Sequence, residues 1–335
     1  MLLLTEPGPV LVTGGAGFIG SHLTRSLLDA GFDVSVLDDF SAASPGLLPS
    51  DCRLRVLRGS VLDPDATAMA CRGAMFVFHL AGIVGMNRVT AIPELTYRTS
   101  LAGTANVLRC SHPVPVVLFS SSAVYGLTTG SFGSAEGDAS REKACAYDGR
   151  RRGYASGKWQ SERLGTRAWR TGRPVLTIRP FNVVGPGQGT DGGMVIPRLV
   201  NEALSGEPLT VFGDGRQSRC FSEISTFVSS VLRLSGSAPA WHSGWNCFNV
   251  GTQVATSILD LARVVIEETG SSSRMVSCPY ESVFPDKADV RRRVPDVRRI
   301  THAIGPIAWP DVRAIVRQCI LPTELARITT REVRW

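Results

Sequence analysis

A tyrosine and a lysine stand four residues apart in the segment "GYASGK", as Tyr154 and Lys158. Four residues make roughly one helical turn, so a helix would present both side chains on one face. An ammonium beside a phenol lowers the pKa of the phenol, which lets the tyrosine act as a base near neutral pH. Because Tyr-x-x-x-Lys also occurs by chance on protein surfaces, its meaning depends on its neighbours in the fold.

A glycine-rich segment, "VTGGAGFIG", places Gly14, Gly17 and Gly20 between an apolar strand and a helix. Glycines there let the backbone approach a pyrophosphate, whose charge is met by N–H groups at the helix start. The next strand ends at Asp38, about 20 residues on, as a dinucleotide-binding fingerprint requires. Asp38 can accept hydrogen bonds from an adenosine ribose and repels a 2′-phosphate, so the pattern favours NAD over NADP.

Three hydroxyls, Ser120, Ser121 and Ser122, follow the apolar segment "VPVVLF", which has the composition of a buried strand. Ligands of parallel α/β sheets bind beyond the carboxyl ends of the strands. A serine there could complete a proton path from Tyr154 to a substrate alcohol, while Lys158 bonds the nicotinamide ribose. The alternative is an ordinary polar turn.

The elements that position these residues alternate between strands and helices. Strands are predicted at 9–14, 33–39, 53–59, 74–82, 114–119, 173–181 and 246–251, and helices at 17–31, 63–73, 92–110, 153–171, 223–234 and 256–270. Repeated strand–helix units predict an α/β protein with a Rossmann-type, doubly wound parallel sheet. We predict a dinucleotide-binding domain of residues 1–180 plus about 217–250, and a smaller substrate-binding lobe of residues 181–216 and 251–335.

The composition excludes several classes of partner. The net charge is +7, and all but three of the 36 Lys and Arg residues are arginine. The arginine clusters at 150–152 and 291–293 lack the interleaved aromatics of a nucleic-acid stacking platform. We therefore expect no nucleic-acid partner, and attribute the charge to an arginine-rich surface together with a site for a small anion.

The eight cysteines are scattered, without a Cys-x-x-Cys pair or histidines at metal-ligand spacing. We expect reduced thiols and no metal site. The first residues, "MLLLTEPGPV", lack the basic region of a signal peptide. No apolar stretch reaches the ~20 residues that span a bilayer. A cytoplasmic protein without a membrane partner is expected.

The combined motifs resemble those of the extended short-chain dehydrogenase/reductases, in the NAD-dependent nucleotide-sugar epimerase/dehydratase family. The resemblance covers nearly the whole chain. It is carried by "VTGGAGFIGSHL", Asp38, "FHLAG", "GTANVL", "SSSAVYG", Tyr154 with Lys158, "RPFNVVGPGQ", "GEPLTVFGDGRQSRC" and "RRRVPD". It implies NAD as cofactor, a nucleoside-diphosphate sugar, UDP-linked, as substrate, and a homodimer.

The resemblance also implies roles for individual residues. The family's catalytic serine or threonine stands three residues before the valine of "VYG", here Ser121, and it acts with Tyr154, Lys158 and the adjacent Ser122. The implied cofactor-binding residues are Gly14, Gly17, Phe18, Ile19, Gly20, Asp38, Leu80, Ala81, Gly82, Tyr154 and Lys158.

The implied substrate-binding residues are Ser121, Asn182 on a phosphate, Phe212 beside the base, and Arg219 and Arg293 on the diphosphate. Arginine forks match diphosphate oxygens well. The alternative for the two arginines is a surface salt bridge.

The reaction that the resemblance implies begins with transient oxidation of the sugar, usually at C4. An epimerase returns hydride to the other face, a 4,6-dehydratase needs an Asp-Glu pair after the catalytic hydroxyl, and a glucuronate decarboxylase uses a Glu just before "VYG". This chain has Ser122 and Ala123 there. A methyl group is neither acid nor base, which disfavours dehydration, whereas a β-keto acid can lose carbon dioxide with less help.

Several stretches, including "HLAGIVG" and "RRRVPD", look most like the UDP-glucuronate decarboxylase branch. We predict an NAD-dependent 4-epimerase of a UDP-hexose or UDP-hexuronate, with a UDP-glucuronate decarboxylase or a 4-keto-sugar-forming oxidase as the alternative. A hypothesis from another class is a non-catalytic NAD-sensing regulator. The Tyr-Lys pair is usually damaged in such proteins, and here it is intact.

Overall fold

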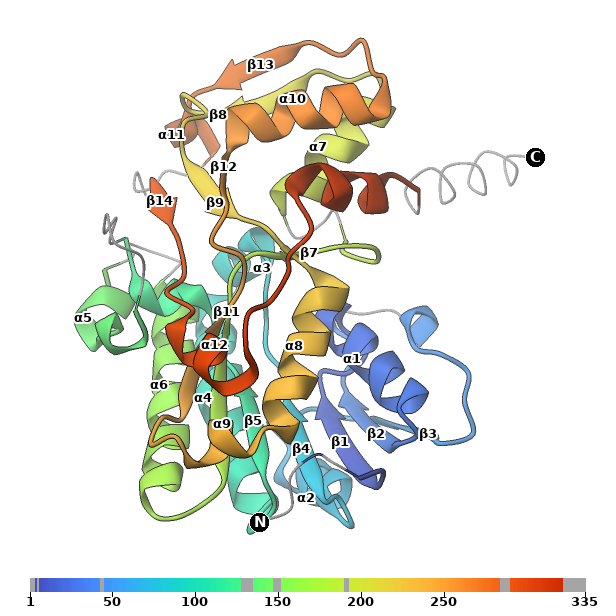
Figure 1. Ribbon diagram of the computed structural model, residues 1–335, viewed down its shortest axis with the longest axis vertical. Helices are drawn as coiled ribbons and strands as arrows, with labels where there is room; N and C mark the ends of the chain where they lie inside the picture. Colours follow the sequence, from blue (N-terminus) through green and yellow to red (C-terminus); the bar gives the residue numbers. More distant parts are fainter. Residues whose placement is uncertain are drawn as a thin grey trace.

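The computed structural model describes residues 4, 6–42, 45–127, 135–146, 152–189, 193–283 and 290–321. A seven-stranded sheet in the order β11-β6-β5-β4-β1-β2-β3 lies at its centre (Figure 1). All of its neighbouring strands pair in parallel. Its strands are β1 (Pro9–Thr13), β2 (Asp33–Asp38), β3 (Leu54–Arg58), β4 (Phe76–His79), β5 (Val116–Phe119), β6 (Val175–Pro180) and β11 (Cys247–Val250).

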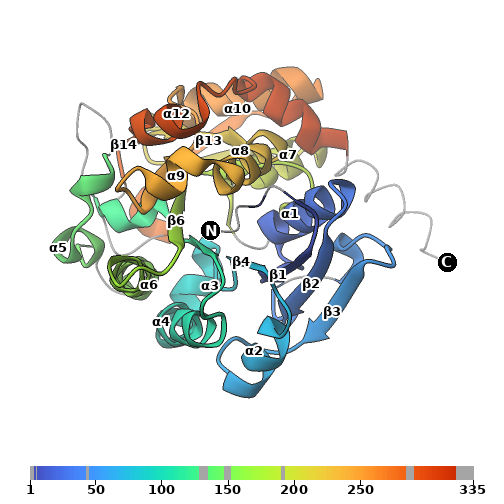
Figure 2. The same cartoon turned by 60° about the horizontal axis from the view of Figure 1, so that its bottom comes forward.

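Helices cover both faces of this sheet, which is why its central strands β1, β4 and β5 are almost continuously apolar. On one face lie α1 (Phe18–Asp29), α8 (Ile224–Gly236), α9 (Ala238–His242) and α12 (Arg298–Ile304). On the other lie α2 (Pro64–Cys71), α4 (Pro93–Cys110) and α6 (Arg152–Arg170) (Figure 2). The predicted doubly wound α/β fold is confirmed.

Strand order reverses between β1 and β4, so the carboxyl ends of these two strands flank a switch point. Connections from the two strands leave towards opposite faces there, which opens a crevice at the strand ends. The sequence-predicted phosphate loop follows β1, and the serine run follows β5, one strand beyond β4. The fold therefore places both motifs along one edge of the sheet.

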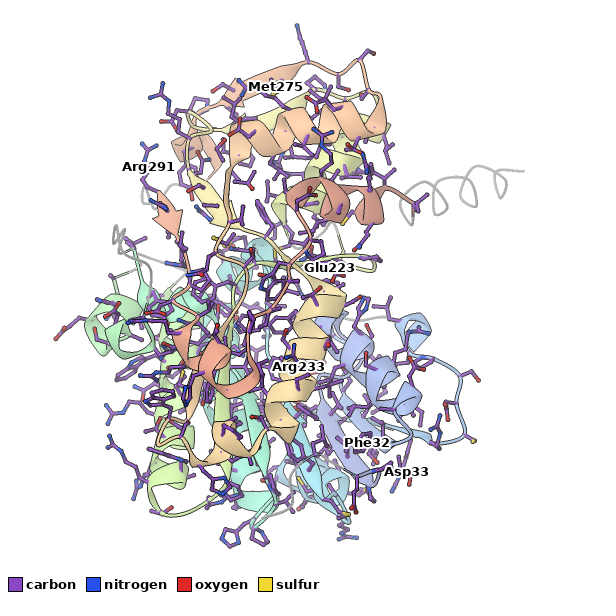
Figure 3. The ribbon with its side chains drawn as sticks, viewed as in Figure 1. Phe32, Asp33, Glu223, Arg233, Met275 and Arg291 are labelled. Carbon is purple, nitrogen blue, oxygen red and sulfur yellow. The ribbon has the colours of Figure 1, made fainter. Side chains whose placement is uncertain are left out.

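Local sequence signals account for the helix boundaries. Asp63 accepts hydrogen bonds from the N–H groups of Asp65 and Ala66 and caps α2, whose first residue is Pro64, as predicted. Glu223 caps α8 by accepting from Ser225 and Thr226. Figure 3 shows Glu223 at the upper end of that helix.

A second core lies above the sheet in Figure 1. It is built by α7 (Val195–Leu204), β8 (Leu209–Phe212), α10 (Ile258–Thr269), β13 (Met275–Cys278) and residues 312–320. Smaller sheets pair β12 (Ala255–Ser257), β9 (Ser218–Cys220) and β14 (Arg292–Arg293), and β10 (Ser222–Glu223) with β7 (Val183–Val184). Further helices among the described residues are α3 (Met86–Ala91), α5 (Arg141–Ala144) and α11 (Tyr280–Val283), and residues 312–321 are also helical. The 3-10 helices in these ranges are η1 (Pro45–Leu47), η2 (Ser122–Tyr125) and η3 (Glu136–Asp138).

The predicted lobe boundaries stay a prediction, but one segment lies elsewhere than its sequence position indicated. Helix α12 falls within 251–335, yet Ile300 and Ala303 pack into the core on the face of the main sheet. A short amphipathic helix carries no sequence signal for which of two cores it covers. Of the predicted arginine clusters, Arg150 and Arg151 lie outside the described residues.

Candidate active site

The turn after β1 is packed so closely that only glycine fits at two of its positions. Gly14 has a φ of +71°, and a Cβ there would lie 2.6 Å from the backbone N of Ala81. A Cβ on Gly20 would lie 2.1 Å from the carbonyl oxygen of Gly14. Strand β1, the start of α1 and the loop after β4 therefore meet backbone to backbone, as the predicted phosphate loop requires.

The start of α1 fits a bound pyrophosphate. Within the described part of the chain no side chain caps its first N–H groups, and its first turn, which includes Phe18 and Ile19, has no acidic residue. Such N–H groups carry a partial positive charge and favour an anion. NAD supplies such a pyrophosphate, so the residues of this loop fit the cofactor.

The Asp38 carboxylate is fixed at the carboxyl end of β2. One oxygen accepts from the N–H of Ala16 at 3.0 Å and the other accepts from the N–H of Phe40 at 2.9 Å. Burial raises the pKa of Asp38, and these two hydrogen bonds oppose the rise. Each oxygen keeps a lone pair for a further donor, as two ribose hydroxyls would need.

A buried histidine, which the sequence analysis did not single out, positions the loop after β4. His79 Nδ1 lies 2.7 Å from Thr13 Oγ1, and its Nε2 lies 3.1 Å from Thr104 Oγ1. Burial, with a smaller effect of Lys158, lowers the pKa of His79 to about 3, so the ring is neutral. Thr13 Oγ1 also accepts from the N–H of Ala81 at 3.3 Å. This array fixes Leu80, Ala81 and Gly82 relative to the glycine turn.

Lys158 is buried at the end of β5. Its Nζ donates to the carbonyl oxygen of Phe119 at 2.8 Å, and a Cβ on Gly82 would lie 3.3 Å from the same nitrogen. Burial lowers the pKa of Lys158 to about 8, against an opposing effect of the Glu162 carboxylate. The ammonium is thus partly deprotonated only slightly above neutral pH.

The serine run forms the start of a 3-10 turn beside this lysine. Ser121 Oγ accepts from the N–H of Ala123 at 3.1 Å and caps η2, while Ser120 and Ser122 are buried. Tyr154 lies half-buried on α6, one turn before Lys158. The structure therefore brings the serine turn, Lys158 and the loop of Leu80–Gly82 to neighbouring strand ends.

The predicted diphosphate-binding arginines lie side by side, although 74 positions separate them. Arg219 of β9 is the register partner of Arg293 of β14. Arg219 Nη1 donates to the carbonyl oxygens of Val290, at 2.5 Å, and Ser218, at 2.9 Å. Arg293 donates to the carbonyl oxygen of Gly126, which directly follows the serine turn. These backbone carbonyls orient both guanidinium groups beside the serine turn.

The other two predicted substrate-binding residues lie on different elements. Asn182, just after β6, has a φ of +38°, and its Nδ2 donates to the carbonyl oxygen of Cys220 at 3.0 Å. Phe212 ends β8, and the guanidinium carbon of Arg198 lies 4.8 Å from the centre of its ring. Asn182 is thereby tied to the strand of Arg219, whereas Phe212 belongs to the second core's small sheet.

All eight cysteines are free thiols, as predicted. Among the described residues, no group of three or more His, Cys, Asp or Glu side chains could hold a metal ion. Within the same ranges, no helix has the length and apolar composition needed to cross a bilayer.

A switch point with a glycine loop, an acid after the second strand and a Tyr-Lys helix defines a Rossmann-type dinucleotide enzyme. The chain belongs to the NAD dependent epimerase/dehydratase family, whose sequence profile matches residues 10–240. It is an enzyme of this NAD-dependent family, as the sequence motifs indicated.

Several proteins similar to this chain are named for UDP-linked sugars or were solved with them bound. The UDP-N-acetyl-alpha-D-glucosaminuronate decarboxylase of Bacillus cytotoxicus is 33% identical over 87% of this chain and 89% of that protein. MoeE5 in complex with UDP-glucuronic acid and NAD is 31% identical, with a TM-score of 0.80 over 95% of this chain and 100% of that one. The UDP-glucose 4-epimerase of Thermotoga maritima, solved with UDP-glucose, is 25% identical, with a TM-score of 0.81 over 96% and 99% of the two chains.

Proposed function

We propose that this chain is an NAD-dependent 4-epimerase of UDP-hexoses or UDP-hexuronates. The observation that carries the proposal is Ala123, in the serine turn. The family resemblance implies a glutamate at that position in a glucuronate decarboxylase. In a 4,6-dehydratase it implies an Asp-Glu pair after the catalytic hydroxyl. With Ser122 and Ala123 there, the turn offers no carboxylate, and return of hydride to either face remains the simplest fate of the oxidised sugar.

The proposed mechanism assigns the proton to Tyr154. Its phenolate oxygen takes the proton of the sugar C4 hydroxyl, and Ser121 Oγ hydrogen-bonds the same oxygen of the sugar. Lys158 stabilises the phenolate by its charge. The glycine turn and Asp38 would hold NAD, which would supply the acceptor and donor of the C4 hydride. The protonated Tyr154 then gives its proton back to the 4-keto oxygen.

Epimerisation also requires that the oxidised sugar ring rotates, so that its other face meets the cofactor, while the nucleotide stays bound. Arg219 and Arg293 come from two paired strands and are oriented by backbone carbonyls. Paired forks of this kind can hold a diphosphate firmly by several charge-assisted hydrogen bonds. The sugar, which needs few contacts of its own, is then free to rotate about its bonds to the diphosphate.

A UDP-glucuronate decarboxylase is the second candidate. Its support is the 33% identity to a decarboxylase of a UDP-linked sugar acid. Once C4 is oxidised, a hexuronate is a β-keto acid and can lose carbon dioxide without a dedicated catalytic acid. The third candidate, a non-catalytic NAD sensor, is disfavoured by the intact Tyr154 and Lys158 pair.

Product analysis separates the three candidates. We expect the purified protein to convert UDP-glucuronate or UDP-glucose into the C4 epimer. Proton NMR of the sugar ring measures this conversion. Retention of all six sugar carbons is the expected result. Release of carbon dioxide with a pentose product would replace the epimerase by the decarboxylase, and NAD binding without turnover of either sugar would favour the sensor.

The pH dependence should report Lys158. Because its pKa is lowered by burial to about 8, the ammonium is present below that pH and is lost above it. We expect kcat/KM for UDP-glucuronate to fall as the pH rises through about 8, which a pH profile measures. Lys143→Met, the control, should show the same fall of kcat/KM above about pH 8. A profile that stays flat to pH 10 would contradict the role of Lys158.

A further inference from the structure

The guanidinium of Arg179, at the end of β6, is buried and binds three groups. Its Nε and Nη2 donate to the two carboxylate oxygens of Glu162, at 2.8 and 2.6 Å. Its Nη1 donates to the hydroxyl oxygen of Tyr125 at 2.8 Å and to the carbonyl oxygen of Glu136 at 2.9 Å. We call Arg179, Glu162 and Tyr125 the Arg179 clamp.

The surroundings of the clamp fix it further. The Tyr125 hydroxyl donates to Asn249 Oδ1 at 2.6 Å, and the backbone N–H of Asn249 donates to Glu136 Oε1 at 3.1 Å. Arg179, Glu162 and Tyr125 are 4%, 7% and 1% exposed, so bulk water does not compete for these hydrogen bonds. In such surroundings each of them has a defined geometry.

The clamp joins the two elements that carry the proposed catalytic groups. Glu162 lies one turn after Lys158 on α6, on the face that also carries Tyr154. Tyr125 is the last residue of η2, the 3-10 turn that Ser121 caps. One guanidinium therefore contacts both the helix of the proposed base and the turn of the proposed serine.

Stability alone does not require such a group. Buried ion pairs can often be replaced by well-packed apolar residues without loss of stability, because desolvation offsets their attraction. A planar fork with several fixed donors instead sets relative positions, which an ammonium cannot do in the same way. The effect of the positive charge and the effect of the planar donor geometry can thus be separated by experiment.

We propose that Arg179 is a positioning residue, which holds the Ser121 turn and the Tyr154–Lys158 helix at the spacing that proton transfer requires. This inference rests on the proposed catalytic set of Ser121, Tyr154 and Lys158. It does not depend on whether the oxidised sugar is epimerised or decarboxylated, since both reactions begin with the same proton transfer.

The first test compares Arg179→Lys and Tyr125→Phe with the wild type, using UDP-glucuronate. Lysine keeps the charge and loses the fork, and phenylalanine keeps the ring and loses the hydroxyl. Small displacements of reacting groups cost up to about 100-fold in rate, so we expect kcat to fall about 10- to 100-fold in each variant. KM should change much less than kcat, because the proposed diphosphate contacts of Arg219 and Arg293 are not altered.

A matched control removes a buried hydrogen bond elsewhere. Trp241 of α9 donates from Nε1 to the carbonyl oxygen of Ser235 at 2.8 Å and packs against Phe76, at the opposite end of the sheet strands. Trp241→Phe should lower the melting temperature and leave kcat unchanged. If Arg179→Lys keeps the wild-type kcat, or if the control loses as much, the positioning role is overturned.

A double variant tests whether Tyr125 acts through Arg179. If it does, Arg179→Lys with Tyr125→Phe should be no slower than Arg179→Lys alone. Losses that multiply would show that the two side chains act independently and would contradict a shared clamp.

A readout without substrate keeps this inference separate from the proposed function. Amide hydrogen exchange in the segments 121–127 and 152–162 should become faster in Tyr125→Phe, while exchange in β1 and β2 stays as in the wild type. Uniformly faster exchange would indicate a purely stabilising role. This measurement decides the question even if the wild type turns over neither UDP-sugar, which would defeat the proposed function alone.

Discussion

Tyr154→Phe is expected to lower kcat by about 10² to 10⁴-fold, the usual contribution of a positioned acid–base group. The variant keeps the aromatic ring and its half-buried place on α6, one turn before Lys158, but has no oxygen to take the proton. Binding of NAD should persist, because the glycine turn and Asp38 are untouched. Steady-state rates with UDP-glucuronate and calorimetric titration with NAD measure the two effects.

A matched variant is available on the neighbouring helix. Tyr97 lies on α4, and Tyr97→Phe removes a hydroxyl of the same kind without touching the proposed catalytic set. We expect this control to retain its rate. Full activity in Tyr154→Phe would remove the proton-transfer mechanism, whatever the product of the reaction.

Gly20→Ala is expected to lower the affinity for NAD strongly and to lower the free energy of unfolding. A methyl group at this position would lie 2.1 Å from the carbonyl oxygen of Gly14 and 2.7 Å from the Cα of Gly15. Both atoms are backbone, so the turn itself must move. Forced overpacking typically costs about 1–3 kcal/mol of stability, occasionally more. A displaced turn should weaken NAD binding by about 100-fold, which corresponds to about 2.8 kcal/mol.

The comparison for this variant is Gly73→Ala. Gly73 has a φ of +74°, yet no atom lies within 4 Å of a Cβ built there. The substitution strains one residue in the left-handed region, at a cost of about 1–2 kcal/mol, without crowding a neighbour. NAD titration should match the wild type in Gly73→Ala and fail in Gly20→Ala. Equal NAD affinities in both variants would refute the proposed packing of the turn.

Local sequence signals were sufficient for the seven strands of the main sheet and for α1, α2, α4, α6, α8 and α10. Asp63 and Pro64 fixed the start of α2, and the observed helix begins where they predict. The central parallel strands were recognisable because both of their faces are buried, which leaves apolar runs. Helix α3 was not predicted, because its six residues, Met86–Ala91, are too few to display a helical period.

The sequence alone determined the glycine turn, Asp38, the serine run and the Tyr154–Lys158 spacing, because each depends on residues that are close along the chain. The tertiary structure decided that Arg219 pairs in register with Arg293 and that α12 covers the main sheet. It also decided the Arg179 clamp, whose partners come from separate elements at positions 125, 162 and 179. Such contacts depend on strand order and helix packing, which no short-range periodicity encodes, so the sequence could not show which of these residues meet.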